Sequence, residues 1–205
     1  MEFYEVIKKR KTSREWTDKA VNFEAIKRII EAGLAAPTHN HLREWEFVVL
    51  HEQAEKENCM QFAKAWAEEH GLTDPDRLFP DGSVMQRMYQ YAMPRQYTML
   101  ATAPYIIIPL FKSYSLRSDY VDQLNVFSSI WCVVENMFLA ATAEGLGTSM
   151  RIPVGEEGAK VCKALDIPSG WMMPCYIGIG YPKADAPEVE QLTFSAEQKM
   201  HMGKW

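Results

Sequence analysis

The sequence has few cysteines and no pattern that ties them together. Four cysteines occur among 205 residues, at positions 59, 132, 162 and 175, and no two of them form a CxxC pair. This spacing argues against a disulfide framework and against a cysteine-based zinc site. No apolar run reaches the roughly 18 residues that a membrane span requires, and the N-terminal stretch lacks the apolar core of a signal peptide. We therefore expect a reduced, cytoplasmic protein with no membrane partner.

Basic residues are also fewer than acidic residues. The chain has 22 Lys and Arg against 27 Asp and Glu, a net charge of −5 and a pI near 5.6. Binding to nucleic acid requires a basic surface, so we expect no nucleic-acid partner. A length of 205 residues with 47% apolar and 24% charged residues is typical of a single globular domain. No internal repeat or linker divides the chain.

Helical and strand patterns alternate along the sequence and predict an α+β fold. Apolar spacing predicts helices and strands, the helices over about 3–10, 23–34, 53–70, 85–101, 122–143 and 155–165, and the strands over 45–50, 105–111 and 173–180. Pro94 is expected to break its helix, and Pro109 to end its strand. Residues 71–84 are rich in turn formers and predict an exposed connection. We predict a three-layer α-β-α sandwich, with a small mixed sheet flanked by helices, as one domain over 1–205.

The stretch 122–143 is apolar nearly all round. A helix of this kind lies in the centre of a fold or in a dimer interface. The last stretch, about 183–205, has no clear period and is long for a loose end. We expect it to form a C-terminal arm that wraps a partner subunit.

A short basic cluster follows the first predicted helix. Arg10, Lys11, Thr12, Ser13 and Arg14 combine cations with hydroxyl groups. A phosphate monoester needs such donors, because it offers several strong acceptor oxygens. The alternative is a solvated helix end whose cations complement the helix dipole, and composition alone favours that alternative.

Two further segments have the composition of ligand-binding loops. Residues 36–45 (APTHNHLREW) join a helix to a strand, which is a common place for a ligand. His39 and His41 have no carboxylate or cysteine at ligand spacing, so we predict no metal; a simple capping loop is the alternative. Residues 145–153 (GLGTSMRIP) lack the third glycine of a dinucleotide fingerprint and follow a helix. Their glycine backbone can approach a flat ring closely.

Together these segments carry a family resemblance. The chain resembles the nitroreductase family of flavin oxidoreductases in an R-[RK]-[ST]-x-R motif at 10–14, an A-P-[ST] loop at 36–45, an A-x-x-x-G-L-G-T segment at 141–148 and an LxIPxGWxxxxxIxIGYP segment at 165–182. The resemblance spans about residues 3 to 182, and the shared order and spacing of the motifs carry it. It implies an intertwined homodimer with two FMN sites at the interface, built from both subunits.

The resemblance also implies roles for individual residues. Arg10 and Thr12 would bind the FMN phosphate with Lys11 beside them, and Arg14 would lie at the pyrimidine edge of the ring. A cation there favours the reduced flavin, which is anionic near N1. The remaining expected contacts are Pro37, Thr38 and His39 from the other subunit, Met150, Arg151 and Ile152 against the ring, and Lys204 at the phosphate.

The chain departs from the family pattern at two places. His41, Leu42, Arg43 and Glu44 stand where the family has N-x-Q-P, and Asn40 lies one place from the usual asparagine. Arg151 stands where many relatives have an apolar residue. A charge there would select an anionic or polar substrate.

The function implied is FMN-dependent oxidoreduction. NADH or NADPH would reduce the flavin, which would pass the electrons by ping-pong turnover to a small electron-poor acceptor such as a nitroaromatic, a quinone or an enone. No catalytic residue of the chain's own is expected, because the cofactor carries the chemistry, and the sequence contains no nucleophile elbow. The alternatives are a flavin-binding or flavin-processing protein of the same fold without NAD(P)H turnover, and a helical interaction protein with no cofactor.

Overall fold

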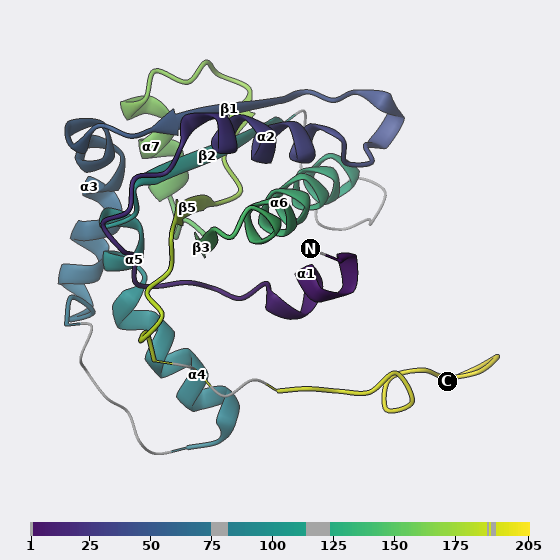
Figure 1. Ribbon diagram of the computed structural model, residues 1–205. Coiled ribbons are helices and arrows are strands. Elements are labelled where there is room, and N and C mark those ends of the chain that lie inside the picture. The colour runs from purple at the N-terminus through teal and green to yellow at the C-terminus, as the bar shows by residue number, and fades with distance from the viewer. Residues whose placement is uncertain (1, 75–81, 114–123, 188, 190–191) are drawn as a thin grey trace.

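The computed structural model describes residues 2–74, 82–113, 124–187, 189 and 192–205. Helices cover both faces of a small central sheet, which confirms the predicted α+β sandwich (Figure 1). The helices are α1 (Phe3–Lys9), α2 (Phe23–Leu34), α3 (Gln53–Glu69), α4 (Val84–Ala92), α5 (Thr98–Ala101), α6 (Asn125–Ala143) and α7 (Glu157–Ala164), with 3-10 turns η1 (His39–His41) and η2 (Met93–Arg95). The strands are β1 (Trp45–Leu50), β2 (Tyr105–Lys112), β3 (Gly147–Arg151), β4 (Trp171–Met172) and β5 (Tyr176–Gly180).

The sheet has the strand order β1-β2-β5-β3, and β4 pairs with β2. All of these strand pairs are antiparallel, so the prediction of mixed strands is wrong for the named strands. A parallel contact occurs at the bridge between Thr12 and Thr148. Through that bridge the segment after α1 joins the sheet at the edge formed by β3.

Strand β2 continues past Pro109 to Lys112, so the prediction that the proline ends it is also wrong. Pro109 pairs with Phe47 of β1. On its other side β2 pairs with β5 over Tyr105–Ile107 and with β4 over Phe111–Lys112. Pro109 lies between those two ladders, so a missing N–H on that side interrupts neither of them.

Side chains of β2 alternate between two apolar cores, one on each face of the sheet. Ile107 and Phe111 belong to the core under α2 and α6, whereas Ile106 and Ile108 belong to the core under α3, α5 and α7. All four are essentially inaccessible to solvent. This alternation follows from the two-residue period of a strand and places the sheet in the middle of three layers.

Helices α2 and α6 form the layer that bears most on the site. Asn22 caps α2 by accepting a hydrogen bond from the Glu24 N–H at 2.9 Å, as the sequence predicts. A Cβ on Gly33 would lie 2.8 Å from Cγ of Met137, so this glycine permits the close approach of α2 to α6.

Helix α6 is long and apolar enough, by length and composition alone, to cross a membrane. Its residues Ile130, Val133 and Met137 are nevertheless fully buried against the rest of the fold. This packing is that of a core helix. Val126, Phe127 and Trp131 are only partly buried, so α6 also keeps apolar surface exposed.

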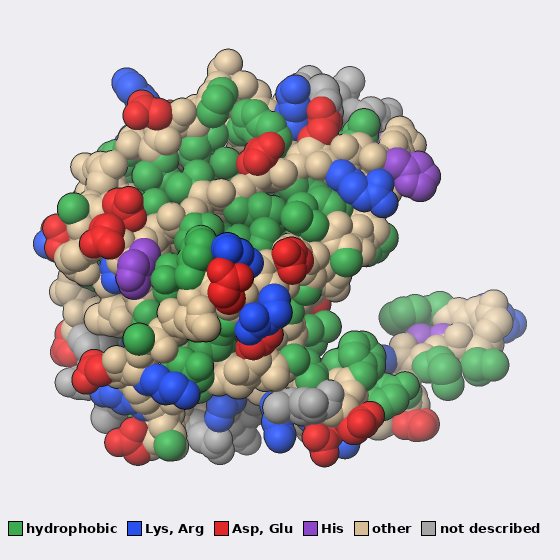
Figure 2. All heavy atoms as spheres, turned by 45° about the horizontal axis from the view of Figure 1, so that its top comes forward, with side chains coloured by type: hydrophobic (Ala, Val, Ile, Leu, Met, Phe, Trp, Pro, Cys, Tyr) green, Lys and Arg blue, Asp and Glu red, His purple; other side chains and the backbone are tan. Residues whose placement is uncertain are grey.

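The two ends of the chain lie outside the three layers. Helix α1 contacts α6 and leaves Phe3, Tyr4 and Ile7 exposed. The last residues extend away from the body, and Figure 2 shows them as a separate lobe with apolar side chains on its surface. Phe194, Met200, Met202 and Trp205 are all exposed there. The expected connection at 71–84 falls partly outside the described residues.

Candidate functional site

The basic segment Arg10–Arg14 is fixed to the edge of the sheet by backbone contacts. The Ser13 N–H donates to the Thr148 carbonyl oxygen at 2.8 Å, and a Cβ on Gly147 would lie 2.7 Å from Cβ of Ser13. The Trp16 indole N–H donates to the Met99 carbonyl oxygen at 2.7 Å. Gly147 is therefore required for the close packing of β3 against Ser13.

Arg10, Lys11, Thr12 and Arg14 line one pocket of about 400 Å³. The pocket lies between this segment, the α4 residues Met88 and Tyr91, and the stretch that follows β5. Its volume is within the range of small-molecule sites. The Arg10 Nε atom lies 3.9 Å from a carboxylate oxygen of Glu135 on α6, and both side chains are well exposed. Such a loose surface pair leaves the guanidinium available to a stronger anion.

Arg14 is the residue of this segment with the least ordinary environment. Its Nε atom is buried, and no hydrogen-bond partner for that atom occurs among the described residues. Burial lowers the pKa of Arg14, and the nearby charge of Arg95 lowers it further, while Tyr91 opposes the shift. A buried donor without a partner is energetically costly, so a ligand that accepts a hydrogen bond from this Nε–H would be favoured here.

Tyr91 and Arg95 complete this corner, and sequence reasoning missed both. The Arg95 guanidinium lies 3.9 Å from the centroid of the Tyr91 ring, and the Arg14 guanidinium lies 5.6 Å from it. Arg95 is buried and donates to the Tyr91 carbonyl oxygen at 3.0 Å. The sequence signal was a lone arginine after a helix-breaking proline, and no motif contains it.

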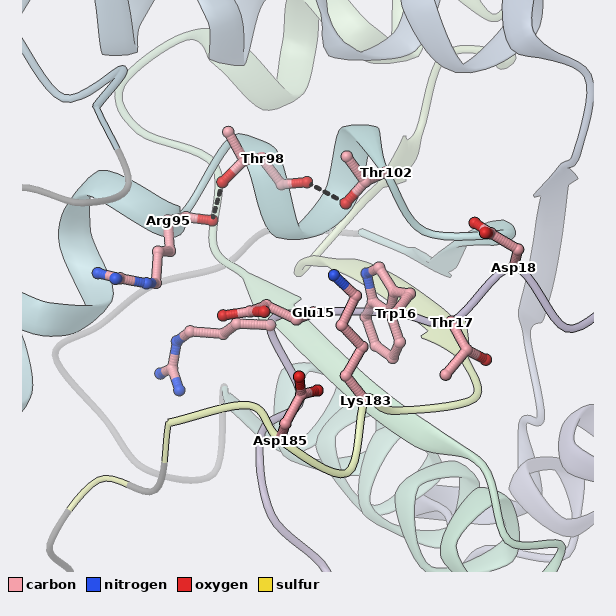
Figure 3. Close-up of a pocket in the computed structure, with 10 residues that line it drawn as sticks. Glu15, Trp16, Thr17, Asp18, Arg95, Thr98, Thr102, Lys183 and Asp185 are labelled. Carbon is pink, nitrogen blue, oxygen red and sulfur yellow. Dashed lines mark hydrogen bonds between the residues drawn. The ribbon is translucent and has the colours of Figure 1, made fainter.

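A second pocket of about 780 Å³ adjoins the first and shares Arg14, Glu15 and Lys183 with it. Figure 3 shows Thr98 and Thr102 on one side, with Lys183 and Asp185 rising from the chain after β5. The Thr98 and Thr102 hydroxyls donate to carbonyl oxygens of Arg95 and Thr98, respectively. Charged side chains of both signs, among them Lys183 and Asp185, line this pocket together with Trp16.

The other predicted site residues do not line either pocket. Pro37, Thr38 and His39 lie in the connection between α2 and β1, where the His39 N–H donates to the Ser129 hydroxyl of α6 at 3.0 Å. Lys204 lies in the exposed C-terminal tail. Within one chain the structure thus assembles only the Arg10, Lys11, Thr12 and Arg14 part of the predicted set.

The loop that departs from the family pattern has an unusual backbone. Asn40, His41 and Arg43 have φ angles of 50°, 56° and 46°. Residues other than glycine rarely adopt this left-handed region, and such strain gathers at ligand sites and switch regions. Two of these residues, His41 and Arg43, are also among those that depart from the family pattern.

Met150, Arg151 and Ile152 lie at the end of β3 and in the turn that follows it. Ile152 is exposed, and Met150 is partly buried. Arg151 is only 3% exposed and forms a buried ion pair with Glu157. The expectation that its charge selects an anionic substrate is therefore wrong, because the guanidinium is already engaged inside the protein.

Among the described residues, no group of three or more His, Cys, Asp or Glu side chains is arranged to hold a metal ion. His39 and His41 therefore have no ligating cluster around them.

Comparison with known proteins assigns the chain to a protein family. The sequence model of the nitroreductase family matches residues 7–181. The chain belongs to the nitroreductase family. Family members that it resembles include the iodotyrosine deiodinase of Nematostella vectensis, which is 27% identical over 198 residues. Those residues are 94% of this chain and 71% of that relative, and the match to the Daphnia pulex deiodinase covers 60% of its length.

Solved structures share this fold over nearly the whole chain. A BluB-like flavoprotein from Clostridium difficile 630 has a TM-score of 0.76 at 19% identity and covers 100% of both chains. An iodotyrosine deiodinase bound to FMN and 3-iodo-L-tyrosine has a TM-score of 0.73 at 19% identity, with 98% of this chain and 100% of that chain covered. At this identity the likeness shows the fold alone.

Proposed function

We propose that the protein is an FMN-dependent oxidoreductase that transfers electrons from NADH or NADPH to a small electron-poor acceptor. The observation that carries the proposal is the Arg10–Arg14 segment, in which a cluster of cations and a hydroxyl lines one pocket and ends at a half-buried arginine whose buried Nε has no hydrogen-bond partner among the described residues. Membership of the nitroreductase family and an FMN-bound relative of the same fold support it.

The residues present fit a cofactor with a phosphate at one end. Arg10, Lys11 and Thr12 are at least partly accessible and offer charge-assisted and hydroxyl donors to a phosphate. Arg14 offers a buried donor about four residues further along the chain. The hydrogen bond from Ser13 to Thr148 fixes the backbone between these two ends, so their spacing is set before any ligand binds.

Each part of the site has a physical task in this proposal. Arg10, Lys11 and Thr12 bind the phosphate, and Arg14 holds a positive charge in a poorly solvated place where it acts strongly. The Tyr91 ring lies against Arg14, and Arg95 packs on the same ring. FMN, when bound, supplies the hydride and electron transfer, so the chain needs no acid, base or nucleophile for that step.

We propose further that two copies of the chain complete the site. Pro37, Thr38, His39 and Lys204 line neither pocket of one chain, and the resemblance assigns the first three to the other subunit. The apolar surfaces of α1, α6 and the C-terminal tail support such pairing, because a monomer would leave them in water.

The experiment is an anaerobic reduction of the FMN-loaded protein. Rapid bleaching of the flavin absorption by NADH or NADPH, followed by reoxidation with a nitroaromatic or a quinone, is the expected result. Bleaching by dithionite but by neither nicotinamide would refute the proposed turnover. That outcome would favour a flavin-binding or flavin-processing protein of the same fold.

A second candidate function is reductive removal of a halogen from an aromatic ring. The curated relatives that favour it are named iodotyrosine deiodinases and match at least 90% of this chain. Reduced, FMN-loaded protein incubated with 3-iodo-L-tyrosine would then release iodide. Absence of iodide release, with a nitroaromatic still reduced, would exclude this candidate.

A further inference from the structure

A buried polar cluster lies beneath the turn between β3 and α7. Glu157, at the start of α7, is 6% exposed. Its carboxylate accepts hydrogen bonds from the Arg151 guanidinium of β3 and from the Tyr176 hydroxyl of β5. Its second oxygen accepts the Val154 backbone N–H at 3.2 Å. One carboxylate thus joins two strands, a helix and the turn between them.

This buried polar cluster contributes little net stability for the desolvation that it requires. A buried ion pair loses much of its attraction to desolvation, and apolar side chains of the same volume are often as stabilising. Arg151 also leaves its Nη2 atom without a partner among the described residues. Val161, one turn further along α7, is fully buried in the apolar core and already attaches the helix to the sheet. We therefore attribute to the polar cluster a role that apolar packing does not fill, which is to fix the conformation of the turn between β3 and α7.

The geometry that Glu157 specifies is that of the turn itself. The Val154 N–H is held directly, and Arg151 approaches the Ile152 carbonyl oxygen at 3.5 Å while bound to the same carboxylate. Both turn side chains, Ile152 and Val154, are about half exposed although they are apolar. A turn held by these hydrogen bonds presents its two apolar side chains from a backbone that is fixed before a ligand binds.

We propose that Glu157 is a positioning residue that fixes the Ile152–Val154 turn against the ring of bound FMN. The proposal rests on the proposed function, because the resemblance implies that Met150, Arg151 and Ile152, which lead into this turn, lie against the ring. Tyr176 and Arg151 act through Glu157, since both donate to its carboxylate. None of the three needs to touch the cofactor.

The experiment compares FMN binding by Glu157→Gln and Tyr176→Phe with that of the unmodified protein. Fluorescence titration gives the Kd, and the absorption band of bound flavin reports the environment of the ring. We expect Glu157→Gln to raise the Kd about tenfold and to shift the band. Tyr176→Phe removes only one donor and should raise the Kd about threefold. If the Glu157→Gln variant does not fold, the Kd and flavin spectrum of the Tyr176→Phe variant alone test the proposal.

Two control variants separate positioning from stability. Val161→Ala destabilises the same helix by leaving a cavity but leaves the cluster intact, and Tyr105→Phe removes a buried tyrosine hydroxyl outside the cluster. Both should keep the Kd and the flavin spectrum unchanged. Equal changes in Val161→Ala, or unchanged binding and spectrum in the folded cluster variants, would overturn the proposal. Failure of the unmodified protein to bind FMN would instead count against the proposed function.

Discussion

Replacement of Arg14 by glutamine tests the electrostatic role of this half-buried arginine. Arg14 approaches Tyr91, burial lowers its pKa, and its Nε has no partner among the described residues. A hydrogen bond to a charged group contributes about 1.5–3 kcal/mol. If that contribution is made mainly to reduced FMN, Arg14→Gln lowers the two-electron midpoint potential by about 30–65 mV, since 30 mV corresponds to about 1.4 kcal/mol.

The assay is a spectroelectrochemical titration of both proteins with FMN bound. Arg28→Gln is the matched control, because Arg28 is an exposed arginine paired with Glu144 at 2.6 Å and lies in neither pocket. It should leave the potential unchanged. An Arg14→Gln protein that binds FMN at the same potential as the unmodified protein would remove Arg14 from the ring.

Three further predictions follow from the same structure. Static light scattering should give a mass near twice 23.6 kDa at micromolar concentration, and a mass near that of one chain would contradict the two-copy site. Arg95→Gln should raise the Kd for FMN severalfold, because Arg95 packs on Tyr91 beside Arg14, and an unchanged Kd would show that this corner does not depend on it. Burial raises the pKa of the Cys59 thiol from 9.0 to about 12, so above pH 9 the unfolded state loses this proton first and stability falls as pH rises. The free energy of unfolding, measured in urea between pH 9 and 11, should fall by about 1.4 kcal/mol less per pH unit in Cys59→Ala than in the unmodified protein, and equal slopes would contradict the burial argument.

Local signals predicted the elements whose cause lies within a few residues. The Asn22 cap, the strand over residues 45–50 and the break at Pro94 all depend on near neighbours, and each is confirmed. The continuation of β2 past Pro109 was missed because it depends on where β4 and β5 begin and end beside it. The extent of these neighbouring strands cannot be predicted from the sequence around Pro109.

The site shows the same division between local and distant causes. The family motifs identified Arg10, Lys11, Thr12 and Arg14, and the structure brings these four to one pocket. The environment of Arg151 was misjudged because its partner Glu157 reads as an ordinary acidic residue in the first turn of a helix. Tyr91 and Arg95 could not be found, since only the tertiary fold brings them beside Arg14.

The most direct test of the central claim compares the binding of FMN with that of riboflavin, which lacks the phosphate. If Arg10, Lys11 and Thr12 hold that phosphate, FMN should bind at least about tenfold more tightly than riboflavin, the equivalent of about 1.4 kcal/mol. Arg10→Gln should weaken FMN binding and leave riboflavin binding unchanged. Equal affinities for FMN and riboflavin in the unmodified protein, or no binding of either, would contradict the account.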